Sequence, residues 1–293
     1  MPLVRFISGR TGGIIFFVIP KEKKLVNKNI NAHCHVYPHK IAARAIEGIK
    51  TFYQIDNMTL NGETSDLIRE GDALNTTHYL IHSVATVPAQ VNSINEFIAE
   101  EVRTHDGVFT GFGTLHPDSE DIVADYAHLL ELGLKGVKLH PDFQNFGLDT
   151  DRADKLAQVI AKNPVPVMVH CGDPRNNLSN PPQMKAFVEK YPELTIIGAH
   201  LGGWSKWEEA AALLPGHDNL YVDCSSSLRD LTPERAVEIF RAYGMDKVIW
   251  GTDYPMWDAS IEMEYFDKLD LSDEERNLIL YENAARLLHI DGY

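Results

Sequence analysis

The chain has 293 residues, of which 44% are hydrophobic, a length that suits one large domain or two small ones. Acidic residues outnumber basic ones by 42 to 27, and the formal net charge of -15 argues against nucleic acid or an anionic membrane as a partner. The number of cysteines is 3 and they include no Cys-x-x-Cys pair, which argues against a disulfide framework and favours a reducing, cytoplasmic compartment.

Residues 1–24 are expected to form a short extension ahead of the main domain. Their apolar run from Gly13 to Pro20 is too short to span a bilayer. A signal peptide is disfavoured, because Lys-Glu-Lys-Lys follows Pro20 where a cleavage site would need small residues. We expect a strand or hairpin here, and the alternative is a start codon assigned too far upstream. Residues 25–293 are expected to form one domain.

Eight apolar runs predict β-strands, and helical patterns separate them. The predicted strands cover residues 25–32, 78–85, 108–115, 134–139, 165–169, 194–199, 219–223 and 247–250. The connection after the first strand is the longest and contains two helical stretches, residues 40–53 and 64–74, which could form a flap over the active site. Two more helices, near residues 260–269 and 272–288, end the chain.

Apolar strands that alternate with helices predict a parallel sheet buried on both faces, and eight such units predict an α/β fold of the (β/α)8 TIM barrel type, here with extra C-terminal helices. A doubly wound open sheet is the alternative. That fold normally carries a glycine-rich loop after its first strand, whereas this chain has His33-Cys34-His35 there.

Imidazole and carboxylate groups stand at the predicted carboxyl ends of the strands, which form the active-site face of such a barrel. Alternate residues of a strand share a face, so His33 and His35 should project together while Cys34 points away. Imidazole nitrogen and carboxylate oxygen are donors that divalent metals such as Zn²⁺ prefer, so these positions predict a metal site. The further polar residues at strand ends are His116, Lys138, His140, His170, His200 and Asp253.

The chain has His-x-His on the first predicted strand, Lys on the fourth, His on the fifth and sixth, and Asp on the eighth. This order resembles the amidohydrolase superfamily. The surrounding motifs are similar to its amidohydrolase-related branch, which includes aminocarboxymuconate-semialdehyde decarboxylase and related metal-dependent decarboxylases. The resemblance covers residues 30–290 and rests on Asn31–Tyr37, Gly136–Pro141, Val167–Gly172, Ala199–Gly203, Trp250–Pro255 and Asn283–Leu288.

The resemblance implies a role for each strand-end residue. It makes His33, His35, His170 and Asp253 the metal ligands of a mononuclear site, and His200 a catalytic histidine beside it. Asp253 would take the proton of a metal-activated water, and His200 would hold the hydroxide or polarise the substrate. Zn²⁺ is the expected ion, with Mn²⁺ as the alternative.

Lys138 leaves two arrangements of the site open. In binuclear amidohydrolases a lysine of the fourth strand is carbamylated and bridges two metals, whereas an ammonium would bind a substrate carboxylate. We favour one ion and a charged Lys138, because the local motifs match the mononuclear branch better. His140, which shares the strand parity of Lys138, and Arg175, in the loop after the fifth strand, are further candidates for substrate binding. For both of these, a purely structural role or a solvated loop position is the alternative.

The function expected from these residues is hydrolysis of an amide, ester or lactone of a small, carboxylated molecule by metal-activated water. The alternative is a non-oxidative, metal-dependent decarboxylase of an aromatic or unsaturated acid, a lyase that would use the same ligands. A barrel that binds a metal without turnover is disfavoured, because Asp253 and His200 are both present. A small-molecule substrate is the expected partner, and a homodimer stays open.

Overall fold

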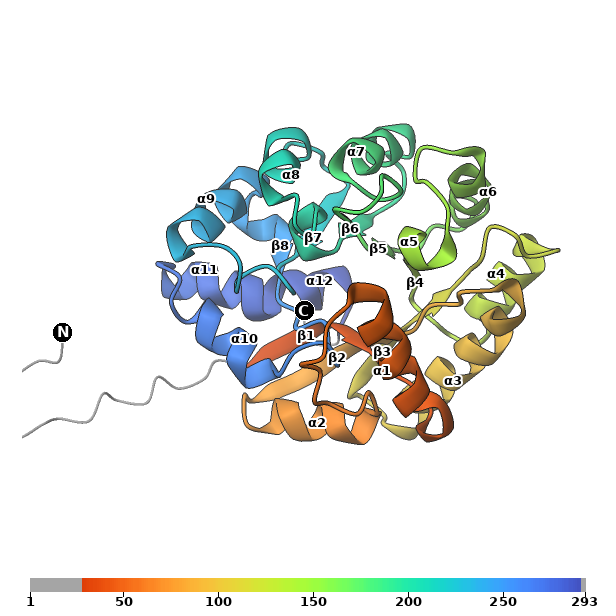
Figure 1. Cartoon of the computed structure of the whole chain (residues 1–293), viewed down its shortest axis with the longest axis horizontal. Coiled ribbons are helices and arrows are strands. Elements are labelled where there is room, and N and C mark those ends of the chain that lie inside the picture. Colours follow the sequence, from red (N-terminus) through yellow and green to blue (C-terminus); the bar gives the residue numbers. More distant parts are fainter. Residues whose placement is uncertain (1–27, 291–293) are drawn as a thin grey trace, which may run out of the picture.

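The computed structural model describes residues 28–290, so the strand or hairpin expected in residues 1–24 lies outside the described residues. Eight parallel strands pair in chain order and confirm the predicted TIM barrel (Figure 1). The barrel closes where the Ala32 N–H donates to the Trp250 carbonyl at 2.9 Å and the His35 N–H to the Tyr254 carbonyl at 2.7 Å. The strands are β1 (Asn29–His35), β2 (Thr76–His82), β3 (Phe109–Thr114), β4 (Gly136–Leu139), β5 (Val167–Val169), β6 (Ile196–Gly198), β7 (Leu220–Asp223) and β8 (Val248–Ile249).

Helices surround the strands, as Figure 1 shows, and the longest connection carries α1 and α2 as expected. The α-helices are α1 (His39–Tyr53), α2 (Thr64–Asp72), α3 (Val91–Thr104), α4 (Ile122–Glu131), α5 (Pro141–Gln144), α6 (Asp151–Ile160), α7 (Pro181–Lys190), α8 (Trp207–Leu213), α9 (Pro233–Tyr243), α10 (Ala259–Phe266), α11 (Asp273–Asn277) and α12 (Asn283–Leu287). Shorter helical turns are η1 (Pro88–Gln90), η2 (His200–Gly202), η3 (Met245–Lys247) and the π-helical η4 (Leu278–Glu282).

The barrel separates two apolar layers. The outer layer lies between strands and helices and contains Cys34, Cys171 and Cys224, which agrees with the expected orientation of Cys34 away from the site. The inner layer fills the barrel and includes side chains from α12, which packs against the strands from below the site. It consists of Ile30, Ala32, Leu80, Phe112, Met168, Ile197, Ile249, Ala284, Ala285 and Leu288.

An irregularity in β1 determines which of its side chains face inward. Asn31 pairs with Tyr79 and Cys34 with Ile81, so three steps along β1 match two steps along β2. Such a bulge shifts the alternation of side chains by one residue. Ala32 therefore packs in the inner layer, while Cys34 two residues later packs in the outer layer and the histidines on either side of it point into the barrel.

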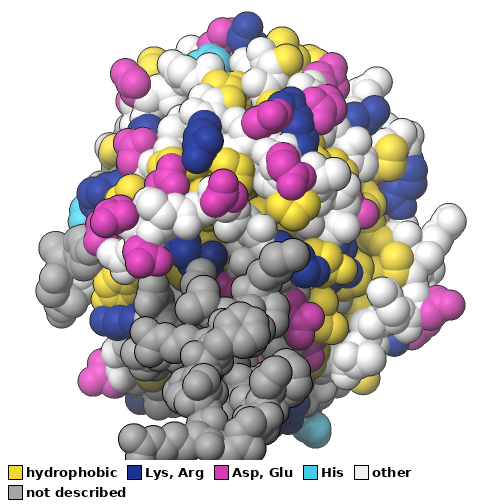
Figure 2. All heavy atoms as spheres, turned by 90° about the vertical axis from the view of Figure 1, so that its left-hand side faces the viewer, with side chains coloured by type: hydrophobic (Ala, Val, Ile, Leu, Met, Phe, Trp, Pro, Cys, Tyr) yellow, Lys and Arg dark blue, Asp and Glu magenta, His cyan; other side chains and the backbone are white. Residues whose placement is uncertain are grey.

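The surface carries charges of both signs. On the face drawn in Figure 2, acidic and basic side chains are interspersed over the described part of the molecule. None of the helices within residues 28–290 combines the length and the apolar character needed to cross a membrane.

Candidate active site

Asp223 holds the ring of His33 in a defined orientation in the site. This ring is fully buried, and its Nδ1 lies 2.9 Å from Oδ2 of Asp223, at the end of β7. A carboxylate can only accept, so Nδ1 carries the hydrogen and Nε2 presents a lone pair. A carboxylate that orients a histidine in this way is typical of metal sites, because it fixes the tautomer and raises the basicity of the other nitrogen.

Two further atoms that can ligate a metal lie close to this lone pair. Nε2 of His33 lies 3.2 Å from Nε2 of His35 and 3.2 Å from Oδ1 of Asp253, and the last two atoms are 3.6 Å apart. A tetrahedral metal with bonds of about 2.0–2.1 Å holds its ligand atoms about 3.3 Å apart. Burial, reinforced by Lys138, holds the pKa of both imidazoles well below the usual range, so both are neutral. The residues present therefore fit a divalent cation.

Asp253 reaches the site through a left-handed turn of the chain after β8. Its φ is 59°, a conformation that non-glycine residues seldom adopt and that is common at functional sites. Oδ2 accepts a hydrogen bond of 2.6 Å from Ser226, whose hydroxyl is in turn bound by the Trp257 indole N–H at 2.8 Å. Burial raises the pKa of Asp253 to about 7. The serine thus fixes one carboxylate oxygen and leaves Oδ1 to face the histidines.

Lys138 lies inside the cluster. The side chain is fully buried on β4, and Nζ lies 3.2 Å from Nε2 of His33. Burial lowers the pKa of Lys138 to about 8, while Asp223 and Asp253 act in the opposite direction. An ammonium and a metal ion cannot share one lone pair, so Nζ must turn toward these carboxylates when His33 binds a cation.

His170 and His200 form a second pair of imidazoles. Nε2 of His170 donates to the Gly172 carbonyl at 3.2 Å, and Nδ1 of His200 donates to the Ser225 carbonyl at 3.1 Å. The two remaining nitrogens, Nδ1 of His170 and Nε2 of His200, are 3.1 Å apart. Both then present lone pairs, which repel unless a cation or a donated hydrogen lies between them. Burial lowers the pKa of His200 to about 3, so it is a neutral hydrogen-bond acceptor.

A pocket opens onto His35, Asp253 and His170. The first connection covers it, since Tyr37, Ile49, Tyr53 and Met58 form part of its wall. Lys138 is not among the described residues that line it. The remaining lining residues are His35, His140, Phe143, His170, Asp253, Pro255 and Met256.

His140 lies in a stack of flat rings within this pocket. Its ring is parallel to those of Phe143 and His170, with centroids 3.8 Å and 3.9 Å away. Nδ1 accepts the Phe143 N–H at 3.2 Å, so the hydrogen must be on Nε2, which lies 3.0 Å from the Tyr53 hydroxyl. Tyr53 therefore accepts from His140 and keeps its own hydrogen for an acceptor in the pocket.

Arg175 lies beside the pocket rather than in its wall. Its Nε donates to Asp173 at 2.8 Å, another nitrogen donates to the Phe52 carbonyl, and the guanidinium lies 4.3 Å from the centroid of the Phe52 ring. Asp173 is fully buried. In this position Arg175 ties the loop after β5 to the end of α1 and so supports the neighbouring Tyr53.

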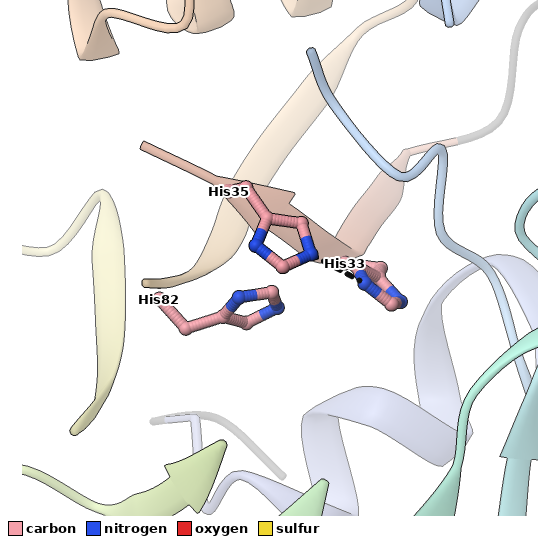
Figure 3. A group of neighbouring side chains, drawn as sticks. All are labelled: His33, His35 and His82. Carbon is pink, nitrogen blue, oxygen red and sulfur yellow. Dashed lines mark hydrogen bonds between the residues drawn. The ribbon is translucent and has the colours of Figure 1, made fainter. Parts of the chain in front are cut away.

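Some residues of the site have roles that the sequence did not predict. Asp223, at the end of β7, was expected only as a carboxylate partner for Lys138, whereas its Oδ2 binds His33. His82 ends β2 beside His33 and His35 (Figure 3), but the predicted strand ran on to residue 85 and placed it inside the strand. Tyr53 and Ser226 lie in a helix and a loop, where the sequence carries no signal for their positions.

The family model described as amidohydrolase matches residues 30–290. The chain belongs to the amidohydrolase family. This match confirms the resemblance drawn from the motifs, and members of the family use a divalent metal. The protein is accordingly an enzyme of the metal-dependent hydrolase or decarboxylase type.

Solved structures of the same fold include both kinds of enzyme. A putative 2-pyrone-4,6-dicarboxylic acid hydrolase from Pseudomonas putida is 19% identical, with a TM-score of 0.63 over 91% of this chain and 99% of that one. The 5-carboxyvanillate decarboxylase of Sphingomonas paucimobilis is 12% identical, with a TM-score of 0.68 over 90% and 99%. A dihydroxybenzoic acid decarboxylase from a Polaromonas species, with bound manganese and 2-nitroresorcinol, is 16% identical, with a TM-score of 0.69 over 91% and 98%. At these identities the likeness establishes the fold.

The bond between His33 and Asp223 generates a prediction about metal affinity. Asp223→Asn replaces a carboxylate by a weaker acceptor, so Nε2 of His33 becomes less basic and less firmly oriented. Zinc binding, measured by competition with a chromogenic chelator, should weaken about 10- to 100-fold. The control Asp154→Asn, in a carboxylate that binds Lys190 and Tyr191 outside the barrel, should leave the affinity unchanged. Equal affinities in the two variants would contradict the role of Asp223.

Proposed function

We propose that the protein hydrolyses an amide, ester or lactone of a small, carboxylated molecule with metal-activated water. The observation that carries the proposal is the convergence of Nε2 of His33, Nε2 of His35 and Oδ1 of Asp253, of which His35 and Asp253 also line the pocket. A divalent cation held there supplies Lewis-acid activation, which lowers the pKa of water from 15.7 to about 7. We favour one ion, Zn²⁺ before Mn²⁺, with His170 as a further ligand.

The side chains around these atoms transfer the proton, orient the water and bind the substrate. Asp253, with Oδ2 fixed by Ser226, accepts the proton of the attacking water at Oδ1. His200 is neutral and anchored through Nδ1, so its Nε2 accepts a hydrogen bond and orients that water. Lys138 remains an ammonium, which the negative charges of Asp223 and Asp253 favour, and adds positive charge beneath the substrate carboxylate. His140 and Tyr53 hold the substrate from the wall of the pocket.

Non-oxidative decarboxylation is the second candidate, and one observation favours it. The parallel rings of Phe143, His140 and His170 make a flat wall that suits a planar aromatic acid. In that reaction the carboxylate leaves as CO2 and a proton replaces it on the carbon, with Asp253 as the group placed to deliver the proton. Two of the fold relatives named above are decarboxylases of aromatic acids, which agrees with this alternative.

The experiment that tests the proposal measures two products. The purified protein is offered lactones, esters and hydroxybenzoic acids, and both acid release and CO2 release are recorded. We expect acid release that chelation abolishes and that Zn²⁺ or Mn²⁺ restores. His33→Asn should lose activity, whereas His78→Asn, in a histidine of β2 bound to Gly107 and Thr110, should keep it. CO2 as the sole product would select the decarboxylase, and full turnover by metal-free protein would refute both candidates.

The hydroxyl of Tyr53 provides a prediction about substrate binding. Its hydrogen is available to the pocket because His140 donates to its oxygen. A hydrogen bond to a charged group contributes about 1.5–3 kcal/mol, so Tyr53→Phe should raise KM about 10- to 100-fold while zinc affinity stays the same. Tyr126→Phe, which removes a hydroxyl bound to the Asn163 carbonyl far from the pocket, is the matched control. Steady-state kinetics with an unchanged KM in Tyr53→Phe would show that this hydroxyl does not touch the substrate.

A further inference from the structure

His82, the last residue of β2, is buried and has no hydrogen-bond partner in the described part of the chain. Its exposed fraction is 0%, and neither ring nitrogen makes a hydrogen bond within residues 28–290. A buried unpaired polar group in a native protein calls for an explanation, such as a catalytic role, a water or an ion. His78 on the same strand shows the ordinary case, since its nitrogens lie 3.2 Å from the Gly107 carbonyl and 2.8 Å from the Thr110 hydroxyl.

The neighbours of His82 are the two histidines of β1. The parallel pairing of the strands sets His82 beside His35, with ring centroids 4.4 Å apart, and His33 lies 5.0 Å away. Figure 3 shows the three rings gathered at the end of these strands. One nitrogen from each ring lies within 4.8 Å of the others. A tetrahedral ion holds its ligand atoms about 3.3 Å apart, so rotation of these side chains would bring the three nitrogens to one cation.

The surroundings restrict what His82 can bind. It is not among the described residues that line the pocket, so a substrate in the pocket meets His35 first. The ring of His82 is fully buried against His33 and His35. The partner that fits there is small, such as an ion.

We propose that His82 is a further ligand of the divalent cation held by His33 and His35. The inference rests on the proposed function, because it assigns a third neighbouring imidazole to the same ion. It extends the ligand set that the motifs indicate to a residue of β2. These three imidazoles come from two adjacent strands, and Asp253 from β8 and His170 from β5 supply the other protein ligands of the proposed set.

The absorption spectrum of Co²⁺-loaded His82→Cys reports whether residue 82 is a metal ligand. A thiolate bound to Co²⁺ gives an intense charge-transfer absorption in the near ultraviolet, which imidazole and carboxylate ligands do not give. The native cysteines all pack in the outer layer, so wild-type protein should lack this band. We expect the band in Co²⁺-loaded His82→Cys and none in His78→Cys, the matched variant four residues earlier on β2.

Zinc affinity gives a second readout that does not depend on activity. We expect His82→Phe to raise the dissociation constant for Zn²⁺ at least 10-fold, and His78→Phe to leave it unchanged. The melting temperature of each metal-free variant shows whether it folds. If His82→Phe fails to fold, the cysteine variant, whose side chain is smaller than the native one, decides the question through its spectrum.

The outcomes separate this inference from the proposed function. A folded His82→Cys that binds Co²⁺ without the band, together with wild-type zinc affinity in His82→Phe, overturns the role of His82. If His33→Asn loses the metal in the same experiment, the proposed function stands and only the role of His82 is rejected. Wild-type protein that binds neither Co²⁺ nor Zn²⁺ overturns both.

Discussion

The hydrogen bond between Nδ1 of His33 and Asp223 is the interaction on which the rest of the site depends. It joins the ends of β1 and β7, which flank β8 in the closed barrel, and it fixes the tautomer of a fully buried ring. Because Nδ1 must donate, Nε2 presents its lone pair to His35, Asp253 and Lys138. The same carboxylate also accepts from the Ser225 hydroxyl through its other oxygen, at 2.5 Å, so both of its oxygens are engaged in holding the site together.

Burial then determines the chemistry of the cluster. It disfavours imidazolium, so the histidines at the barrel mouth are neutral bases rather than cations, and it favours uncharged Lys138 and Asp253 unless they pair. A cluster of lone pairs facing one another in a buried place is unfavourable without an electrophile. The fold supports it because eight strands and the inner layer beneath them fix the backbone, and because left-handed turns at His200 and Asp253 direct two side chains inward.

The sequence predicted the barrel and most strand-end residues, because apolar strands and helical spacing repeat eight times and the histidines follow directly. It was less successful for residues whose role depends on where a strand ends. The second strand was drawn to residue 85, so His82 was treated as interior, and the bulge at Ala32 leaves no signal in the pattern. The position of Arg175 against Asp173, and the direction of the His170 ring toward His200, follow from contacts between distant segments that single-sequence reasoning does not provide. The proposed metal ligands and substrate-binding residues accordingly stay predictions.

The central claim is that His33, His35 and Asp253 share one divalent cation. A crystal structure of zinc-loaded protein, with anomalous diffraction measured on both sides of the zinc absorption edge, tests it most directly. The account predicts one anomalous peak about 2.0–2.2 Å from Nε2 of His33, Nε2 of His35 and Oδ1 of Asp253, with an unmodified Lys138 amine. Two peaks bridged by density on Nζ of Lys138, or a single peak away from these three atoms, would contradict it.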